Sequence, residues 1–302
     1  MRPFARRDPA SQAWLSLADG HRVSSGPPPM HLSSADLDAY RERGCHLARG
    51  LFCAEEIARV LAAAERDQEL ARHAFARDDG EGGRVRLSLW NHPGDDVYGV
   101  LSRTARVVER AEQLTGGEVY HYHSKLIKKD PEVGGAWAWH QDYGYWYENG
   151  LLAPDLVSMF VALDPATRDN GCLQVVPTSH RLGRLDHQLT GEQAGADPDR
   201  VAHVLQRLDV EHVEMAAGDA LFFHPNLLHR SDQNRSAQRR WAMICCYNRA
   251  DNEPVVAHHH PGYTKLHKLP DAALLQQDLD RAQPQQSWLD PDHDHSARRR
   301  PQ

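Results

Sequence analysis

Cysteine is scarce in this sequence and forms no recognisable motif. The 302 residues include five cysteines, none in a C-x-x-C spacing. A disulfide framework or a cysteine-based zinc site needs a denser or more regular pattern. We therefore expect free thiols and a reducing, cytoplasmic environment.

Long hydrophobic runs are missing as well. No stretch of 18 apolar residues occurs, and the basic segment 1–7 leads into Asp8-Pro9 without an apolar region. A membrane-spanning helix needs about 20 apolar residues, and a signal peptide needs an apolar region after its basic start. We predict a soluble chain without a membrane partner.

An excess of positive charge is also absent. The formal net charge is -7 at pH 7, whereas nucleic-acid-binding proteins concentrate Lys and Arg on one face. The run Arg298-Arg299-Arg300 is short and is typical of a solvated tail. The sequence argues against a nucleic-acid partner and favours a small-molecule ligand. It does not indicate an oligomeric state.

The chain length fits one domain with short extensions. Residues 1–30 end in Gly26-Pro27-Pro28-Pro29, which is typical of a stiff linker, so we predict a flexible N-terminal arm. The single domain is predicted to span residues 31–264. Apolar periodicity thins after that point, so we expect residues 265–302 to form a poorly packed tail.

Helical patterns come first along the chain, and strand patterns follow. Helices are predicted from apolar spacing, with Ser33 and Asp36 as a capping pair and Gly116-Gly117 as a stop. These helices cover residues 34–43, 54–70 and 105–114. Strands are predicted at 119–127, 156–163, 173–176, 210–215, 220–224 and 241–247. This order predicts a mainly β fold with flanking helices, a double-stranded β-helix (jelly roll, cupin-like). The polar segment 183–199 is expected to form a long loop over the site mouth.

The most informative motif is His140-Gln141-Asp142, with His229 far downstream. On an extended strand, residues two apart point the same way, so His140 and Asp142 can bind one ion together with a distant imidazole. Two histidines and one carboxylate on one face of a metal form the triad of non-heme iron(II) oxygenases. This triad leaves about three of six coordination positions open for an oxidisable cosubstrate and dioxygen.

Arg240 follows the second histidine closely enough in the sequence for the two to share a hairpin. Ser231 and a turn-like segment separate His229 from Arg240, which opens an apolar strand, so a hairpin would bring them close. The planar guanidinium of Arg240 can hold a carboxylate with two parallel hydrogen bonds. This pattern predicts that the metal site also binds a dicarboxylate whose other end chelates the iron, as 2-oxoglutarate does.

Other histidines leave alternatives open. His224 also ends an apolar strand and could replace His229 as a ligand. His121 and His123 alternate onto one face of their strand, where we interpret them as barrel histidines with satisfied hydrogen bonds. The run His258-His259-His260, together with His293 and His295, is interpreted as solvated surface.

The motifs together resemble the phytanoyl-CoA dioxygenase family of iron(II)/2-oxoglutarate oxygenases over roughly residues 33–250. The resemblance is carried by Trp139-His140-Gln141-Asp142, by the segment 169–180 from Asp169-Asn170-Gly171 to His180, and by the segment 218–234 that includes His229. It implies that His140, Asp142 and His229 bind Fe(II). It also implies that Arg240 and Ser231 receive the distal carboxylate of 2-oxoglutarate.

Further roles follow from the same resemblance. Lys125 and Phe160 stand where the family places residues beside the cosubstrate. The block around Trp146 and Glu148-Asn149-Gly150 is similar to ectoine hydroxylases. Because Asp142 fills the carboxylate position, the resemblance implies hydroxylation rather than halogenation.

The predicted function is therefore hydroxylation of an aliphatic C–H bond of a small molecule, with O2 as cosubstrate and release of succinate and CO2. The candidate substrate residues are Tyr143, Trp146, Gln174, Arg184 and His187. A cupin-like metal-binding protein or isomerase that does not use 2-oxoglutarate is the main alternative, and a non-enzymatic binding protein with a degenerate site is a third. The sequence does not identify the substrate.

Overall fold

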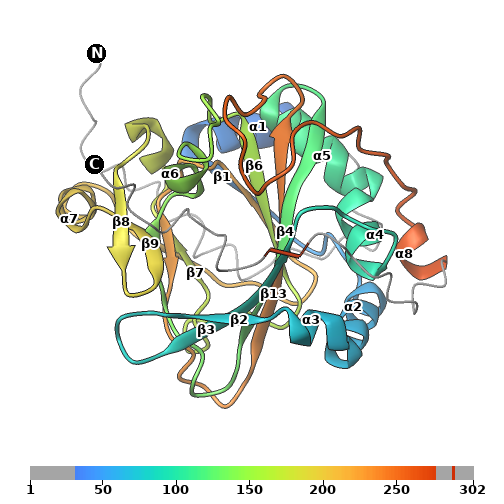
Figure 1. Cartoon of the computed structure of the whole chain (residues 1–302), viewed down its shortest axis with the longest axis horizontal. Helices are drawn as coiled ribbons and strands as arrows, with labels where there is room; N and C mark the ends of the chain where they lie inside the picture. The colour runs from blue at the N-terminus through green and yellow to red at the C-terminus, as the bar shows by residue number, and fades with distance from the viewer. Residues whose placement is uncertain (1–30, 277–287, 290–302) are drawn as a thin grey trace.

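The computed structural model describes residues 31–276 and 288–289. The predicted N-terminal arm, much of the predicted tail, and His293 and His295 lie outside the described residues. The described part is mainly β, with a seven-stranded, a four-stranded and a two-stranded sheet (Figure 1). Within these sheets the neighbouring strands run antiparallel.

The strands have the following bounds and order. The large sheet contains β1 (Cys45–Ala48), β11 (Ala220–Phe223), β6 (Leu156–Ala162), β13 (Arg240–Arg249), β4 (Val119–Lys129), β3 (Arg84–Trp90) and β2 (Phe75–Asp78). The four-stranded sheet contains β10 (Glu211–Val213), β7 (Leu173–Val175), β12 (His229–Ser231) and β5 (Trp137–His140). The third sheet is the hairpin of β8 (His187–Thr190) and β9 (Gln193–Ala196).

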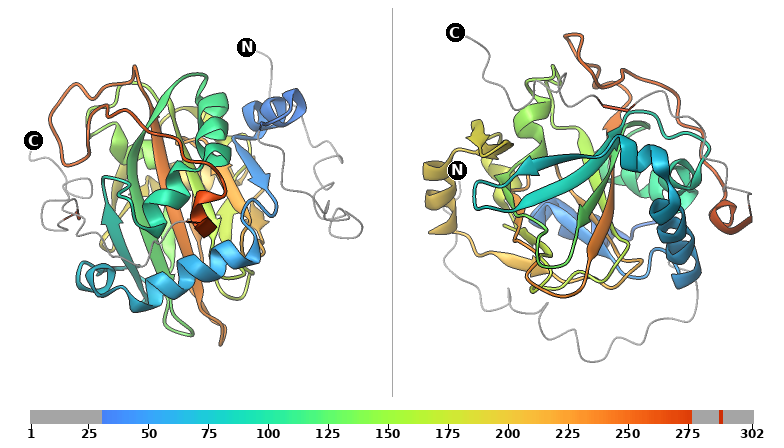
Figure 2. Two further views of the ribbon diagram at one scale, coloured as in Figure 1. Left: turned by 90° about the vertical axis from the view of Figure 1, so that its right-hand side faces the viewer. Right: turned by 60° about the horizontal axis from the view of Figure 1, so that its bottom comes forward.

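Helices lie mostly on the outer face of the large sheet. They are α1 (Ser34–Arg43), α2 (Ala54–Arg66), α3 (Gln68–Arg72), α4 (Val97–Arg103), α5 (Ala105–Thr115), α6 (Asp142–Trp146), α7 (Pro198–Leu205) and α8 (Ala273–Gln276), with a 3-10 turn at Ser179–Leu182. Figure 2 (left) shows α2, α4 and α8 in front of the large sheet. Among the described helices, none is long and apolar enough to cross a membrane.

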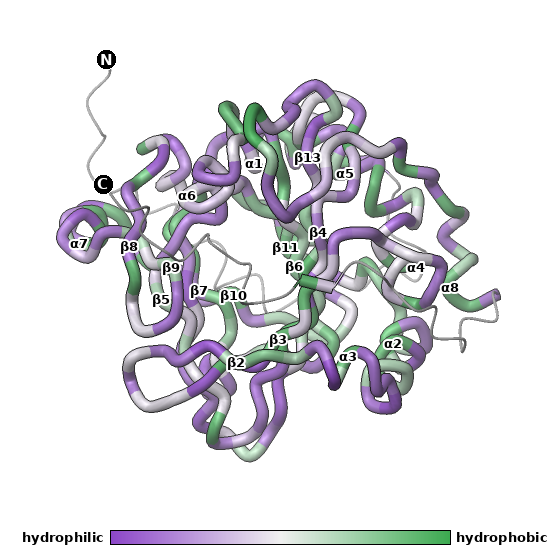
Figure 3. The backbone as a smooth tube through the Cα atoms, viewed as in Figure 1, coloured by the Kyte–Doolittle hydropathy of each residue, from purple (hydrophilic) through white to green (hydrophobic). Residues whose placement is uncertain are grey.

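The large sheet separates two hydrophobic cores. Side chains alternate between its faces, because successive residues of a strand point to opposite sides. Leu126 and Met243 pack with the helices, whereas Ile127 and Ile244 face the second core. Both faces of the central strands are therefore apolar. Hydrophobic residues accordingly predominate along β6 and β11 in Figure 3. The second core borders the polar site described below.

The first predicted helix, 34–43, is confirmed with its capping box, because Asp36 N–H donates to Ser33 Oγ at 3.2 Å. The predicted helix 54–70 is wrong in its continuity. It breaks after Arg66, since Asp67 leaves the helical conformation and its carboxylate caps α3 by accepting the Leu70 N–H at 3.0 Å.

The prediction of a loop at 183–199 is also wrong, because this segment contains the hairpin β8–β9. Helix α7 then begins with Asp197 as N-cap and Pro198 at its first position. Gln193 fixes the hairpin to β5: its amide donates to the Ala136 carbonyl at 2.9 Å and accepts from the Ala138 N–H at 2.8 Å.

Packing continues beyond residue 264, contrary to the predicted start of a loose tail. Ala273 and Leu274 of α8 are buried in the core that contains α2 and α4. Leu289 is buried too, and Trp288 stacks on His73 with ring centroids 5.0 Å apart. Local composition does not reveal these contacts, because the apolar residues after residue 264 are few and widely spaced.

Candidate metal centre and adjoining cavities

The four-stranded sheet brings two distant histidines together. His229 on β12 is the direct partner of His140 on β5, and their ring centroids lie 4.0 Å apart. One ligand atom from each of His140, Asp142 and His229 lies within 4.8 Å of the others, and all three residues are buried. The sequence-predicted triad is thus assembled in space.

Both imidazoles are oriented by the backbone. Nδ1 of His140 donates to the Ala138 carbonyl at 2.8 Å, and Nδ1 of His229 donates to the Leu227 carbonyl at 2.9 Å. Each Nε2 is then left with its lone pair, the form that binds a metal. Burial lowers the pKa of both histidines, which keeps the rings neutral.

Asp142 reaches the centre differently from the prediction. The strand ends at His140, Gln141 is extended, and Asp142 opens helix α6. The shared strand face is therefore wrong, although Asp142 Oδ1 still lies 3.8 Å from His140 Nε2. The turn into α6, rather than a continued strand, brings the carboxylate toward the imidazole.

Two hydroxyl groups hold the Asp142 carboxylate. Tyr145 donates to Oδ1 at 2.5 Å, and Ser158 donates to Oδ2 at 2.6 Å. Burial by itself raises the pKa of Asp142, but the charge of Lys125 and the Ser158 hydrogen bond lower it below its ordinary value. Asp142 is therefore an anion. Sequence reasoning missed Tyr145 and Ser158, which carry no motif of their own.

A cavity, here called the Arg240 cavity, adjoins the triad. Its lining includes the three triad residues together with Arg240, Ser231, Lys129, Lys125 and Phe160. Burial lowers the pKa of Arg240 to about 10, so the guanidinium remains a cation at neutral pH. One of its amino groups donates to the Gly171 carbonyl at 2.7 Å, but Nε and Nη1 are buried without a partner. A buried cation with two unmet donors fits a carboxylate.

Lys129 is a buried lysine that sequence reasoning missed. It lies opposite Arg240 in the pairing of β4 with β13 and is fully buried. Its Nζ donates to Ser231 Oγ at 2.8 Å and to the Asp232 carbonyl. Ser231 is thus tied to a second basic residue, and burial lowers the pKa of Lys129 well below its ordinary value. Lys129 lies beyond the predicted strand 119–127, so no sequence pattern marked it.

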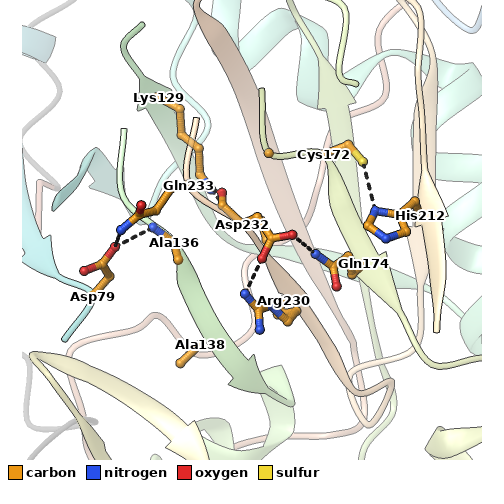
Figure 4. Close-up of polar contacts among 12 residues, drawn as sticks. Asp79, Lys129, Ala136, Ala138, Cys172, Gln174, His212, Arg230, Asp232 and Gln233 are labelled. Atoms are coloured by element: carbon orange, nitrogen blue, oxygen red, sulfur yellow. Dashed lines mark hydrogen bonds and ion pairs between the residues drawn. The ribbon is translucent and has the colours of Figure 1, made fainter. Parts of the chain in front are cut away.

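The rim beyond Lys129 is polar. Figure 4 shows the Asp232 carboxylate between the Gln174 amide and Arg230, both of which donate to it. Gln174, a predicted substrate residue, is therefore engaged with Asp232 on the side of the Arg240 cavity. Arg230 lines that cavity and lies 5.7 Å from the Trp139 ring centroid.

A second cavity, here called the His123 cavity, shares Lys125 and Trp137 with the first. Its lining also includes His123, Tyr145, Trp146 and His260. Trp146, one of the predicted substrate residues, thus lies in its wall.

The remaining predicted substrate residues lie elsewhere. Tyr143 packs in the second core and its hydroxyl donates to the Leu151 carbonyl at 3.0 Å. Arg184 pairs with Asp186 at 2.7 Å and lies over the Tyr147 ring. His187 has both ring nitrogens engaged: Nε2 accepts from the Gln141 N–H and Nδ1 donates to the Leu185 carbonyl, each at 2.9 Å. None of these three lines either cavity.

The other histidines divide into separate environments. A β-bulge in the pairing of β4 with β13 breaks the alternation between His121 and His123, so the expected shared face is wrong. His121 is satisfied by the Asn91 carbonyl and Ser124 Oγ at 2.9 and 2.7 Å. His123 lines the cavity and its Nδ1 has no partner.

The solvated interpretation of the histidine run is also wrong. His260 is buried and stacks on His123 with centroids 4.5 Å apart, and His259 lines the same cavity. His224, the alternative ligand, lies outside the triad, where its Nδ1 accepts the Asn226 N–H at 3.0 Å.

The fold and the site together define a non-heme iron dioxygenase that uses 2-oxoglutarate. The model of the family described as phytanoyl-CoA dioxygenase matches residues 40–242. The chain belongs to the phytanoyl-CoA dioxygenase family.

Named relatives agree with this assignment. The chain is 37% identical over 186 residues to L-proline trans-4-hydroxylase of Streptomyces griseoviridis, covering 56% of this chain and 69% of the relative. It is 32% identical over 272 residues to ectoine dioxygenase of Halomonas elongata, covering 84% and 80%. Among solved structures, EctD from S. alaskensis with 2-oxoglutarate and 5-hydroxyectoine matches with a TM-score of 0.64 at 25% identity, covering 78% of this chain and 81% of that chain.

Proposed function

We propose that this dioxygenase hydroxylates an aliphatic C–H bond of a small molecule, with His140, Asp142 and His229 as the iron ligands. Succinate and CO2 are the products formed from 2-oxoglutarate. The observation that carries the proposal is the pair of unpartnered donors of Arg240, which lines the same cavity as the three ligands. Bound iron supplies the activation of dioxygen that the side chains lack.

The cosubstrate site follows from the charges of the Arg240 cavity. Nε and Nη1 of Arg240 are two unmet donors for the distal carboxylate of 2-oxoglutarate, and Ser231 and Lys129 line the same cavity. Phe160 covers the guanidinium, whose carbon lies 5.6 Å from its ring centroid. Lys125 borders the cavity on the side of Asp142. Arg240, Ser231, Lys129 and Phe160 bind and orient the diacid, and their burial excludes water.

The alternatives are less compatible with this arrangement. A cupin-like isomerase or metal-binding protein without 2-oxoglutarate would leave the two buried donors of Arg240 unsatisfied, at a cost of about 1–3 kcal/mol each. A degenerate binding protein would not need three oriented ligands and this cation in one cavity.

For the substrate, we propose that the His123 cavity receives it and that Trp146 forms part of the wall. Relatives named for L-proline and ectoine make cyclic amino acids and ectoine the first compounds to assay. We propose that His187 supports the metal centre through Gln141 and that Gln174 supports the cavity rim through Asp232. Tyr143 and Arg184 have no contact that favours a substrate role.

We further infer that the two larger sheets form a double-stranded β-helix, or jelly roll, within one domain that spans about residues 31–264 and the packed segment after it. The antiparallel strand orders support this inference. The five free cysteines support a reducing, cytoplasmic location.

Anaerobic spectroscopy tests the proposal directly. Adding 2-oxoglutarate to the Fe(II) protein should produce a weak visible absorption band, and admitting air with a substrate should release succinate. The Arg240→Met variant should lose the band at 2-oxoglutarate concentrations that saturate the wild type. A wild-type protein that shows neither the band nor oxygen consumption would refute the proposal.

A further inference from the structure

The two cavities meet at two residues. Lys125 and Trp137 line both the Arg240 cavity and the His123 cavity. Tyr145, which lines the His123 cavity, donates to the metal ligand Asp142. A molecule in the His123 cavity therefore approaches the metal centre at Lys125, and the groups found there must recognise the part of the substrate closest to the reaction.

Groups at this junction are short of hydrogen-bond acceptors. Lys125 is 8% exposed, and among the described residues its ammonium meets the Trp137 ring at 6.0 Å from the centroid but no hydrogen-bond acceptor. The indole N–H groups of Trp137 and Trp146 are buried without partners, and so is Nδ1 of His123, which donates in one tautomer of the neutral ring. Unmet buried donors cost free energy, so their accumulation in one cavity indicates a missing acceptor.

Neighbouring groups cannot supply that acceptor. The Gln193 carbonyl already accepts from the Ala138 N–H, and the Tyr145 hydroxyl donates to Asp142. His260 donates from Nδ1 to Asn91 Oδ1 at 2.8 Å, since the Asn91 amide nitrogen is committed to the His259 carbonyl. The polar groups next to the junction are thus paired with protein, whereas the donors are left for a ligand.

Charge on the cavity wall points the same way. The ionisable lining residues are Arg77, Lys125 and Glu192, with histidines whose pKa burial lowers. Glu192 is engaged at the rim, where it accepts from the Asp78 N–H at 2.9 Å and lies 3.6 Å from Arg84. Lys125 supplies the positive charge at the junction, and this charge also acts on the Asp142 carboxylate.

We propose that the His123 cavity recognises a small carboxylic acid, amino and imino acids included, by binding its carboxylate at Lys125, with His123 and the Trp137 and Trp146 N–H groups as further donors. This inference rests on the proposed function and names the substrate class for the same site. Charge-assisted hydrogen bonds of a buried ammonium to a carboxylate are among the stronger polar contacts in proteins. Acyl thioesters lack this carboxylate and are not expected to bind there.

Matched acids and amides provide the test. Full-length, iron-loaded enzyme is assayed for succinate release with 2-oxoglutarate and a panel of amino and imino acids, L-proline among them. The primary amide of each acid and an acyl-CoA thioester are assayed in parallel. We expect at least one acid to stimulate succinate release with a KM lower than that of its amide by about 10-fold to 100-fold, as one charge-assisted hydrogen bond implies.

Variants test which residues are responsible for the preference for acid over amide. Lys125→Met should abolish the preference for acid over amide, and Lys125→Arg should retain part of it. His123→Leu should weaken the preference, whereas His224→Leu, which replaces a histidine outside both cavities, should leave it unchanged. A purely structural role for Lys125 would instead reduce turnover of acid and amide by the same factor.

Equal stimulation by acid and amide, stimulation by the thioester alone, or no stimulation by any acid would overturn this proposal. The visible band of the Fe(II) protein with 2-oxoglutarate separates failure of the carboxylate site from failure of the proposed function. If the band forms and the acid preference is absent, only the carboxylate site is wrong. If the band does not form, the proposed function fails first.

Discussion

The backbone N–H of Gln141 donates to Nε2 of His187 at 2.9 Å. This bond ties the single residue between His140 and Asp142 to the β8–β9 hairpin. Gln141 is held from its side chain as well, which donates to the Gly183 and Asn226 carbonyls at 2.9 and 2.7 Å. The Leu185 N–H also donates to Gln141 Oε1 at 2.6 Å, so four contacts from other parts of the chain set the spacing of the two ligands.

Gly144 leaves room for that histidine. A Cβ on Gly144 would lie 2.0 Å from Cε1 of His187, so Gly144→Ala must displace the ring and release the Gln141 N–H. We expect iron affinity to fall by about 10-fold, the lower end for loss of a group that orients metal ligands. Iron titration measures this affinity. Gly117→Ala, which meets only the flexible Arg249 side chain at 3.2 Å, is the control, and equal affinity in the two variants would contradict the role of His187.

The triad itself predicts complete loss of turnover. Asp142→Ala or His229→Ala removes one of the three ligands, so neither variant should form succinate from 2-oxoglutarate. His224→Ala serves as the control, because His224 lies outside the triad. Succinate formation by either ligand variant at the wild-type rate would refute the assignment.

Replacing Arg240 should weaken 2-oxoglutarate binding even when the new side chain is also positively charged. Arg240→Lys keeps a cation but loses the planar fork. The KM for 2-oxoglutarate should rise by about 10-fold to 100-fold, the value of a charge-assisted contact. Arg239→Lys is a matched control, since Arg239 pairs with Asp164 and Glu65 away from the cavity. An unchanged KM in Arg240→Lys would place the distal carboxylate elsewhere.

Buried histidines predict weakening of the fold in mild acid. Burial lowers the pKa of His121 to about 3 and that of His224 to about 4. In the unfolded chain both titrate near 6.5, so between pH 6.5 and about 4 the unfolded state binds more protons than the folded state. The free energy of unfolding should therefore fall as pH falls through this window, by up to about 1.4 kcal/mol per pH unit for each such histidine.

Urea unfolding at a series of pH values measures this dependence. The His121→Gln variant should show a shallower slope between pH 6.5 and 4, even if it is less stable at pH 7. A wild-type midpoint that stays constant across this window would contradict the prediction.

Much of the secondary structure could be predicted from local patterns. Helix 34–43 is marked by the capping box of Ser33 and Asp36, and the strands at 156–163 and 220–224 match β6 and β11 closely. Short edge strands such as β1 and β2, and the hairpin β8–β9, were missed. Their residues are only partly buried, so no clear alternation marks them.

The sequence by itself determined the chemistry: two histidines, one carboxylate and an arginine, with a spacing that only a few metal sites use. These side-chain types determine which atoms can bind a metal and which groups carry charge, whatever path the chain takes. The tertiary structure alone decided which groups share an environment. The bulge in β4 turned His123 toward Trp146 and His260, the register of β4 against β13 placed Lys129 beside Arg240, and folding left the Lys125 ammonium without an acceptor. These relationships depend on long-range pairing and burial, which local sequence does not encode.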